Sequence, residues 1–114
     1  MTAKKITAAF FATPNGGETV RDWLLELPRE DRKRIGDDIK VVEFGWPIGM
    51  PVCRPLGKGL YEVRTNLDSR IARVLFAIEG DRMVLLYGFI KKTQTTPPDA
   101  IDLARTRLQM FRRS

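Results

Sequence analysis

The chain has 114 residues and a formal net charge of +6, and 43% of its residues are hydrophobic. This length and composition are typical of a single globular domain over residues 1–114, and they exclude a disordered chain. With no histidine and one cysteine, the chain lacks the residues for Ser–His catalysis, an internal disulfide or a zinc site built on His or Cys. We therefore expect no metal, no cofactor and a reducing, cytoplasmic setting.

Hydropathy and charge narrow the function classes further. The apolar run near the N-terminus, residues 6–12, is short for a signal peptide, and no stretch approaches the roughly 18 apolar residues of a membrane span. We expect no membrane association. The isoelectric point of about 9.9 favours a polyanionic partner, nucleic acid above all, although many small proteins are basic for solubility alone.

The first 46 residues predict a strand followed by two helices. Residues 4–12 are expected to form the strand, and residues 13–17 a turn. Apolar residues then recur at the spacing of one helical face, first in a helix from Glu18 and then in a second helix that Pro28 begins. These stripes consist of Val20, Trp23, Leu24 and Leu27 in the first helix and Ile35, Ile39, Val42 and Trp46 in the second.

The remaining residues predict a loop, three strands and a last helix. Residues 45–59 hold three prolines and four glycines and are expected to form the loop. The strands are predicted over residues 60–65, 70–78 and 83–92, joined by a loop at 66–69 and by a tight turn at Gly80-Asp81. Thr96 is expected to cap the last helix, with Pro97 in its first position and Asp99 placed for a capping box.

The order strand, two helices, three-strand meander and C-terminal helix indicates an α+β fold. The three later strands are expected to form an antiparallel sheet, and the first strand must pair with that sheet because a lone strand is unstable. We expect the helices to cover one face of the sheet and to leave the other face partly open.

The predicted hairpins place charged residues side by side. A two-residue turn at Gly80-Asp81 pairs Phe76 with Leu85, Ile78 with Met83, Val74 with Tyr87, and Arg73 with Gly88, and a four-residue loop at 66–69 pairs Glu62 with Arg73 and Arg64 with Ile71. Glu62, Arg64 and Arg73 then share one face, while Tyr87 falls on the core face. Lys92 has the parity of the charged face, and Lys91 points the other way unless a bulge turns it.

This charged cluster has two interpretations. Glu62 and Arg73 could be a cross-strand ion pair that contributes about 0.2–1 kcal/mol. Alternatively, the arginines could stabilise a cleaved phosphodiester, because a planar guanidinium binds two phosphate oxygens. The Lys91-Lys92 pair could likewise be a solvated strand end. The basic residues of the last helix could either make the helix soluble or contact RNA, and they are Arg105, Arg107, Arg112 and Arg113. Cys53 and the tryptophans are expected to serve packing.

Three motifs follow one another along the later strands. They are Glu62-x-Arg64, Arg73-x-x-Phe76, and a strand end with Leu86, Gly88, Phe89, Lys91, Lys92 and Thr93, followed by proline and the last helix. This combination resembles the phage-derived, HigB-like branch of the RelE toxin superfamily. The resemblance covers most of the chain and is strongest from residue 60 on.

The resemblance implies a RelE-like fold and the toxin of a type II toxin–antitoxin system. Such a toxin is a ribosome-dependent endoribonuclease, which cuts mRNA in the ribosomal A site by attack of a 2′-hydroxyl on the adjacent phosphate, without a metal. Arg73 and Arg64 would stabilise the pentavalent phosphate, Lys91 or Lys92 would bind phosphate or assist proton transfer, and Glu62 would orient Arg73 or act as base. Further RNA contacts are expected from Tyr87, Arg105 and Arg112.

Tyr87 departs from the pattern of this branch, in which many relatives carry histidine. A tyrosine can donate a proton or stack on a nucleobase, but it is a poor base at neutral pH. The identity of the general base is therefore open, and ribosomal RNA could complete the site.

The resemblance also implies a cognate helix-turn-helix antitoxin, with operator DNA bound only through the toxin–antitoxin complex. Two alternatives remain. One is a nucleic-acid-binding or regulatory protein derived from this fold, which would bind RNA or DNA in a salt-dependent way without cleavage. The other is a structural phage protein that binds other proteins, in which substitution of Arg73 or Arg64 would not affect growth.

Overall fold

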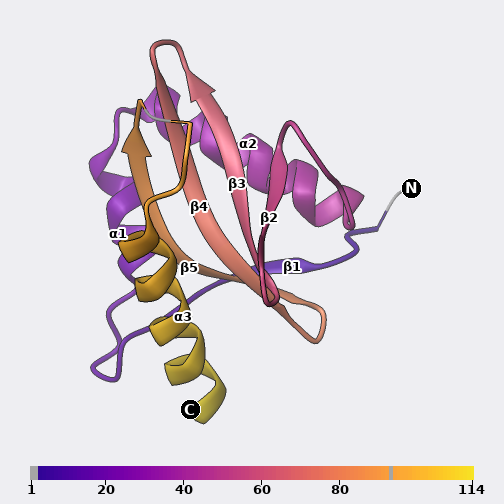
Figure 1. Ribbon diagram of the computed structural model, residues 1–114, viewed down its shortest axis with the longest axis vertical. Coiled ribbons are helices and arrows are strands. Elements are labelled where there is room, and N and C mark those ends of the chain that lie inside the picture. Colours follow the sequence, from indigo (N-terminus) through magenta and orange to yellow (C-terminus); the bar gives the residue numbers. More distant parts are fainter. Residues whose placement is uncertain (1–2, 93) are drawn as a thin grey trace.

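The computed structural model describes residues 3–92 and 94–114, so Thr93 of the strand-end motif lies outside the described residues. The strands and helices form an α+β fold, as predicted (Figure 1). In chain order they are β1 (Thr7–Phe10), α1 (Thr19–Glu26), α2 (Arg29–Gly45), β2 (Cys53–Gly57), β3 (Leu60–Leu67), β4 (Arg70–Glu79), β5 (Arg82–Lys91) and α3 (Pro98–Arg113). None of the helices described is long and apolar enough to cross a membrane.

The sheet has five strands in the order β1-β5-β4-β3-β2. β2 to β5 are antiparallel, whereas β1 runs parallel to β5, so the sheet is mixed rather than purely antiparallel. β2 lies within the predicted 45–59 loop, and the loop prediction is wrong for residues 53–57. This strand contains Pro55 and Gly57, which are tolerated because β2 is an edge strand that pairs with β3 alone.

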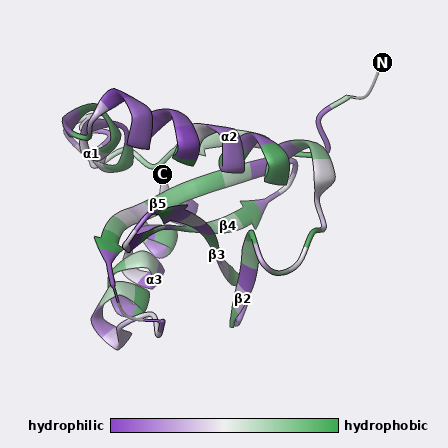
Figure 2. Cartoon of the chain, turned by 90° about the horizontal axis from the view of Figure 1, so that it is seen from above, coloured by the Kyte–Doolittle hydropathy of each residue, from purple (hydrophilic) through white to green (hydrophobic). Residues whose placement is uncertain are grey.

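The helices lie on both faces of the sheet. Figure 2 shows α1 and α2 on one side and α3 on the other. One core cluster joins α1 and α2 to Val63, Val74 and Phe76, and a second joins Ala104 and Leu108 of α3 to the opposite face. The expectation that the helices all cover one face is therefore wrong, since the apolar stripe of α3 packs over part of the other face.

The first turn of α3 differs from the predicted cap. The helix begins at Pro98, and Pro97 is the cap residue, without a side-chain hydrogen bond to the helix. The hydroxyl of Thr96 instead donates to the carboxylate of Glu62 on β3. The Thr96 hydroxyl, which the sequence pattern predicts as the helix cap, thus binds the buried Glu62 carboxylate. This hydrogen bond holds the segment before α3 against the sheet.

The hairpin between β4 and β5 contains a bulge. The two-residue turn at Gly80-Asp81 and the pairs Phe76–Leu85 and Ile78–Met83 are confirmed. Beyond Leu85 the register shifts by one residue, so Leu86 is the extra residue and Leu75 lies opposite Tyr87. The two pairings predicted beyond this point are wrong: Val74 lies opposite Gly88, and Arg73 lies opposite Phe89.

The hairpin between β3 and β4 is tighter than predicted, because β3 continues to Leu67. Leu67 pairs with Arg70, which leaves a two-residue turn in which Asp68 has a φ of 59°. Aspartate tolerates this left-handed conformation better than most residues. As a result Arg64 lies opposite Arg73, and Glu62 lies opposite Leu75. The shift is by two residues, so Glu62, Arg64 and Arg73 still share one face.

Cys53 belongs to the core, as expected. Its side chain is buried in the cluster beneath α1 and α2. Burial raises the pKa of this thiol to about 11, and the nearby Glu62 carboxylate adds to the rise. The thiol is therefore protonated at neutral pH and serves packing rather than chemistry.

Candidate nucleic-acid interface

Three rows of side chains cross the face of the sheet on which α3 packs. Each row contains one residue from β3, one from β4 and one from β5. The rows are Glu62–Leu75–Tyr87, Arg64–Arg73–Phe89 and Asn66–Ile71–Lys91. The bulge at Leu86 brings the three β5 residues onto this face, so the prediction that Tyr87 shares a face with Val74 and Phe76 is wrong.

The centre of this face is a buried ionic cluster. The side chains of Glu62 and Arg73 are both 0% exposed, and Arg73 Nε lies 3.8 Å from Glu62 Oε1. The Arg73 guanidinium also lies over the ring of Phe89, 5.9 Å from its centroid. Glu62 accepts the hydrogen bond from Thr96, so the segment before α3 covers the pair. In this structure neither Glu62 nor Arg73 presents its side chain to solvent, and the two lie together as an ion pair.

Arg64 is the member of the cluster that reaches solvent. Its side chain is 11% exposed, with Nε 3.9 Å from Glu62 Oε2, and Nη2 donates to the side-chain oxygen of Gln94 at 3.0 Å. Burial lowers the pKa of Arg73, the Glu62 carboxylate raises it, and Arg64 and Arg54 lower it again. Glu62 is thus the group that favours the charged form of Arg73, and it lies between the two arginines as their common anion.

An aromatic pair lies beside this cluster on β5. The rings of Tyr87 and Phe89 stack with centroids 5.3 Å apart and an angle of 27° between their planes. Arg107 of α3 lies over Tyr87 at 5.5 Å from the ring centroid, and Lys91 lies over Phe89 at 5.9 Å. Such cation–π contacts keep positive charge next to the ring faces.

The bulge accounts for the position of Arg107. Its Nη1 donates to the carbonyl of Leu86 at 2.8 Å. Burial lowers the pKa of Arg107, and Tyr87 raises it. The sequence pattern does not distinguish Arg107 from the other arginines of α3, because nothing in the pattern reveals the bulge.

Two hollows flank the aromatic pair. One has a volume of about 330 Å³ and is lined by Thr19, Trp23, Tyr87, Gly88, Phe89, Ile90 and Arg107. The other has a volume of about 240 Å³ and is lined by Tyr87, Phe89, Lys91, Pro97, Asp99, Ala100 and Leu103. Each hollow thus has the two aromatic rings on one side and a basic side chain within its wall.

Three of the predicted site residues lie apart from this site. Arg105 Nη2 donates to the carbonyl of Gly57, the last residue of β2, at 3.0 Å. Arg112 pairs with Glu79 at the opposite end of β5 from Lys91. Lys92 follows the last residue of β5 and lines neither hollow. The structure brings Glu62, Arg64, Arg73, Tyr87 and Lys91 together, and it separates Arg105, Arg112 and Lys92 from them.

Charged side chains are unevenly divided between the layer of α1 and α2 and the residues that follow it. Residues 18–43, which contain α1 and most of α2, hold eight acidic and six basic side chains, whereas residues 44–114 hold six acidic and twelve basic ones. Within the described residues, no group of His, Cys, Asp and Glu side chains could hold a metal ion. The arrangement is suited to bind a polyanion through stacking rings and basic side chains.

Gly88 permits the close packing of α1 on β5. A Cβ atom at this position would lie 2.4 Å from Cε3 of Trp23, which is too close for any real contact. We expect Gly88→Ala to lower the free energy of unfolding by about 1–3 kcal/mol, because the indole must move. Urea unfolding followed by fluorescence measures this loss.

Gly36→Ala is the matched control for this substitution. Nothing lies within 4 Å of a Cβ at Gly36, on the exposed side of α2. Alanine is the better helix former, so this variant is expected to be more stable than the parent by about 0.5–1 kcal/mol. Equal stability of Gly88→Ala and the parent would show that Trp23 does not press on β5.

The layered α+β fold and the arginine-rich end of its sheet are compatible with a RelE-like toxin. The chain belongs to the family described as Phage derived protein Gp49-like (DUF891), whose model matches residues 22–109. This family of phage-derived proteins is of the RelE/HigB toxin type. No curated protein matches the chain.

Proposed function

We propose that this protein is the toxin of a type II toxin–antitoxin system and that it cleaves mRNA on the ribosome. The observation that carries the proposal is the alignment of Tyr87, Phe89 and Lys91 on one face of β5, beside Arg64. Membership of a toxin family supports the general class. The excess of basic side chains in residues 44–114 supports a polyanionic substrate.

Binding of the RNA would combine stacking with charge. Single-stranded nucleobases stack on aromatic side chains, and each stacked base contributes about 1–3 kcal/mol. Tyr87, which is half-buried and lines both hollows, would offer the stacking surface, since Phe89 is buried beside it. Arg107 and Lys91, which already lie over these rings, would hold the neighbouring phosphates.

The reaction would need no metal. The 2′-hydroxyl of one nucleotide attacks the adjacent phosphorus, the bond to the 5′-oxygen of the next nucleotide breaks, and a cyclic phosphate and a free 5′-hydroxyl result. Arg64 and Lys91 start from strands separated only by β4, with backbones about 10 Å apart. Their long side chains could therefore reach one phosphate and stabilise its additional negative charge.

Glu62 and Arg73 would act through Arg64. Both are enclosed, so the role of Glu62 as a base in contact with the RNA is not supported by its position. As the shared anion, Glu62 would hold the guanidinium of Arg64 in place, and Arg73 would hold Glu62. The two would then be positioning residues, and the base would come from Lys91, Tyr87 or ribosomal RNA.

The proposed partners are mRNA on the ribosome and a helix-turn-helix antitoxin. The antitoxin would silence the enzyme in the cytoplasm, and operator DNA would be bound only through the complex of the two proteins. Arg105 and Arg112 lie away from the proposed cleavage site, so any RNA contact that they make would be with the ribosome or with distant parts of the message.

Controlled expression in a bacterial host tests the proposed function. Induction is expected to arrest growth and to produce cuts within translated regions, mapped by primer extension, with cyclic phosphate at the upstream ends. Induction of the same gene without its start codon controls for the burden of transcription. If the folded protein accumulates without arrest or cleavage, catalysis is refuted, and the chain is then a binding or regulatory protein derived from this fold.

A further inference from the structure

The sheet has an open edge beyond the end of β2. β2 pairs with β3 only from Leu60 to Val63, and one further bond runs from the N–H of Arg64 to the carbonyl of Val52 at 2.8 Å. β3 continues to Leu67, and Figure 1 shows it extending past β2. Backbone groups alternate along a strand, so the N–H and C=O of Asn66 point to the same edge as the N–H of Arg64. No described strand lies beside Asn66 there.

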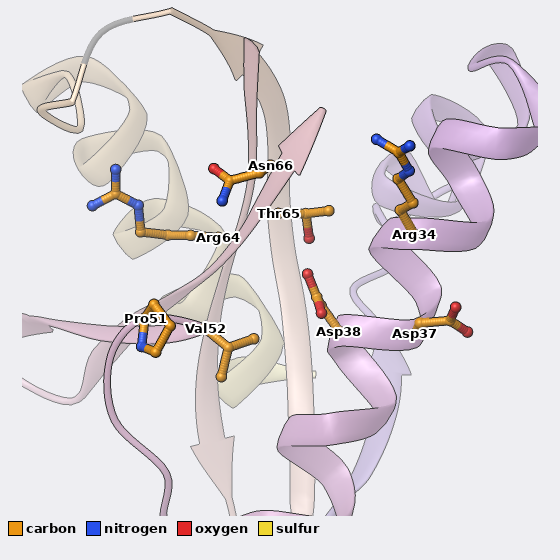
Figure 3. A pocket seen from close by; sticks show the side chains of 8 residues that line it. All are labelled: Arg34, Asp37, Asp38, Pro51, Val52, Arg64, Thr65 and Asn66. Carbon is orange, nitrogen blue, oxygen red and sulfur yellow. The ribbon is translucent and has the colours of Figure 1, made fainter. Parts of the chain in front are cut away.

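A cavity of about 400 Å³ lies next to this edge, between α2 and β3. Figure 3 shows the side chains that line it, which come from α2, from the segment before β2 and from the end of β3. They are Arg34, Asp37, Asp38, Pro51, Val52, Arg64, Thr65 and Asn66. The cavity is therefore continuous with the unpaired part of β3.

The charges around this cavity are compensated, except for one. Arg34 lies 3.5 Å from Asp68, and Asp37 lies 3.0 Å from Lys33. Arg64 contacts Glu62 and Gln94, and in Figure 3 its guanidinium points away from the cavity. Among the residues that the structure describes, the side chain of Asp38 has no partner in an ion pair or a hydrogen bond.

A buried hydroxyl faces this carboxylate. Thr65 is 2% exposed, and its Oγ1 has no hydrogen-bond partner among the described residues. Figure 3 shows the side chains of Thr65 and Asp38 pointing toward one another across the cavity. Buried polar atoms are nearly always paired in folded proteins. A cation with several N–H donors would satisfy both the hydroxyl oxygen and the carboxylate.

We propose that this edge and cavity bind an extended, basic segment of a partner protein. The segment adds a strand beside residues 64–67 through the backbone of Asn66, and it inserts a lysine or arginine between Asp38 and Thr65. Open sheet edges are templates for such strand addition, with the backbone providing affinity and the side-chain pocket providing specificity. With Arg34, Asp37 and Arg64 already paired, the carboxylate of Asp38 complements a basic side chain of the segment.

A peptide titration tests this docking surface on the full ¹⁵N-labelled chain. The probe is the synthetic peptide acetyl-Thr-Val-Arg-Val-Thr-amide, followed by amide chemical shifts. The largest shifts are expected at residues 64–67, with smaller ones around Asp38. Asp38→Asn is expected to weaken binding about tenfold, as loss of one charge-assisted hydrogen bond does. Asp102→Asn, on the exposed side of α3, is the matched control and should leave binding unchanged.

Two altered peptides test the side-chain pocket and the strand edge separately. A peptide with glutamate in place of arginine should lose binding through the pocket, and a peptide with alternate backbone nitrogens methylated should lose binding through the edge. Equal binding of either altered peptide overturns the proposal. Two other results also overturn it. If single-stranded RNA, and not the peptide, shifts the amide signals of these residues, the occupant is RNA. If the free chain sediments as a dimer that Asp38→Asn dissociates, the occupant is a second copy of the chain.

Discussion

Glu62→Gln is expected to lower the free energy of unfolding by about 3–5 kcal/mol. The substitution removes, from a fully enclosed pair, the carboxylate that favours the charged form of Arg73. The loss also weakens the bond from Thr96, which holds the segment before α3 against the sheet. Urea unfolding, monitored by circular dichroism, measures the change without screening the charges as a salt denaturant would.

Glu79→Gln is the matched control for this substitution. Glu79 pairs with Arg112, but their side chains are 26% and 56% exposed, and such a surface pair contributes less than about 1 kcal/mol. A double variant with methionine at both positions 62 and 73 should recover most of the stability, because it removes both charges together. If Glu62→Gln is no more destabilising than Glu79→Gln, the buried pair is not what holds this face together.

Because Arg73 is enclosed, its substitution can abolish activity by unfolding the protein. Arg73 is one of the two arginines to which the family resemblance gives a catalytic role, yet it is enclosed and paired with Glu62. An Arg73→Ala protein that fails to arrest growth could be unfolded rather than catalytically inactive. Accessible side chains such as Lys91 therefore test the proposed chemistry more directly, because their removal leaves the core intact.

Lys91→Ala is expected to reduce the rate of mRNA cleavage about 10²–10³-fold, as removal of one preorganised group at a developing oxyanion does. Its side chain projects from the site face of β5 and is exposed, so the fold should be unaffected. Single-turnover cleavage of a defined message in a reconstituted translation system measures the rate. Circular dichroism establishes that the variant is folded.

Lys92→Ala provides the matched comparison. It removes the same charge one residue later, outside β5 and outside both hollows. Surface substitutions of this kind change free energies by about 0.5 kcal/mol at most, which is roughly a twofold change in rate. An equal fall in the cleavage rate of both variants would mean that the net charge of the protein matters rather than the position of the lysine. A larger fall in the cleavage rate of Lys92→Ala would contradict the register of β5.

Local patterns in the sequence account for much of the fold. The tight turn at Gly80-Asp81 is correct because glycine supplies the positive φ, here 64°, that such a turn requires. The shared face of Glu62, Arg64 and Arg73 is also correct, although the partners across the hairpin are wrong. A slip of two residues changes every partner and leaves every face unchanged, since side chains alternate with a period of two.

Other features arise from tertiary packing and have no local signal. β2 contains a proline and a glycine in five residues, so its pairing with β3 is not visible in its composition. The bulge at Leu86 involves no glycine, and the sequence around it reads as a regular strand. The enclosure of Arg73 depends on α3 and the segment before it, whose position on the second face no periodicity reveals.

The bulge has a further consequence for the history of such a gene. Loss of the single codon for Leu86 would restore an uninterrupted ladder and leave Tyr87 opposite Leu75, so Tyr87, Phe89 and Lys91 would stay on the site face. A regular ladder that kept Leu86 would instead turn these three side chains toward α1 and α2. Versions of the gene that differ by this one codon would therefore present the same surface, although their strands differ in length by one residue.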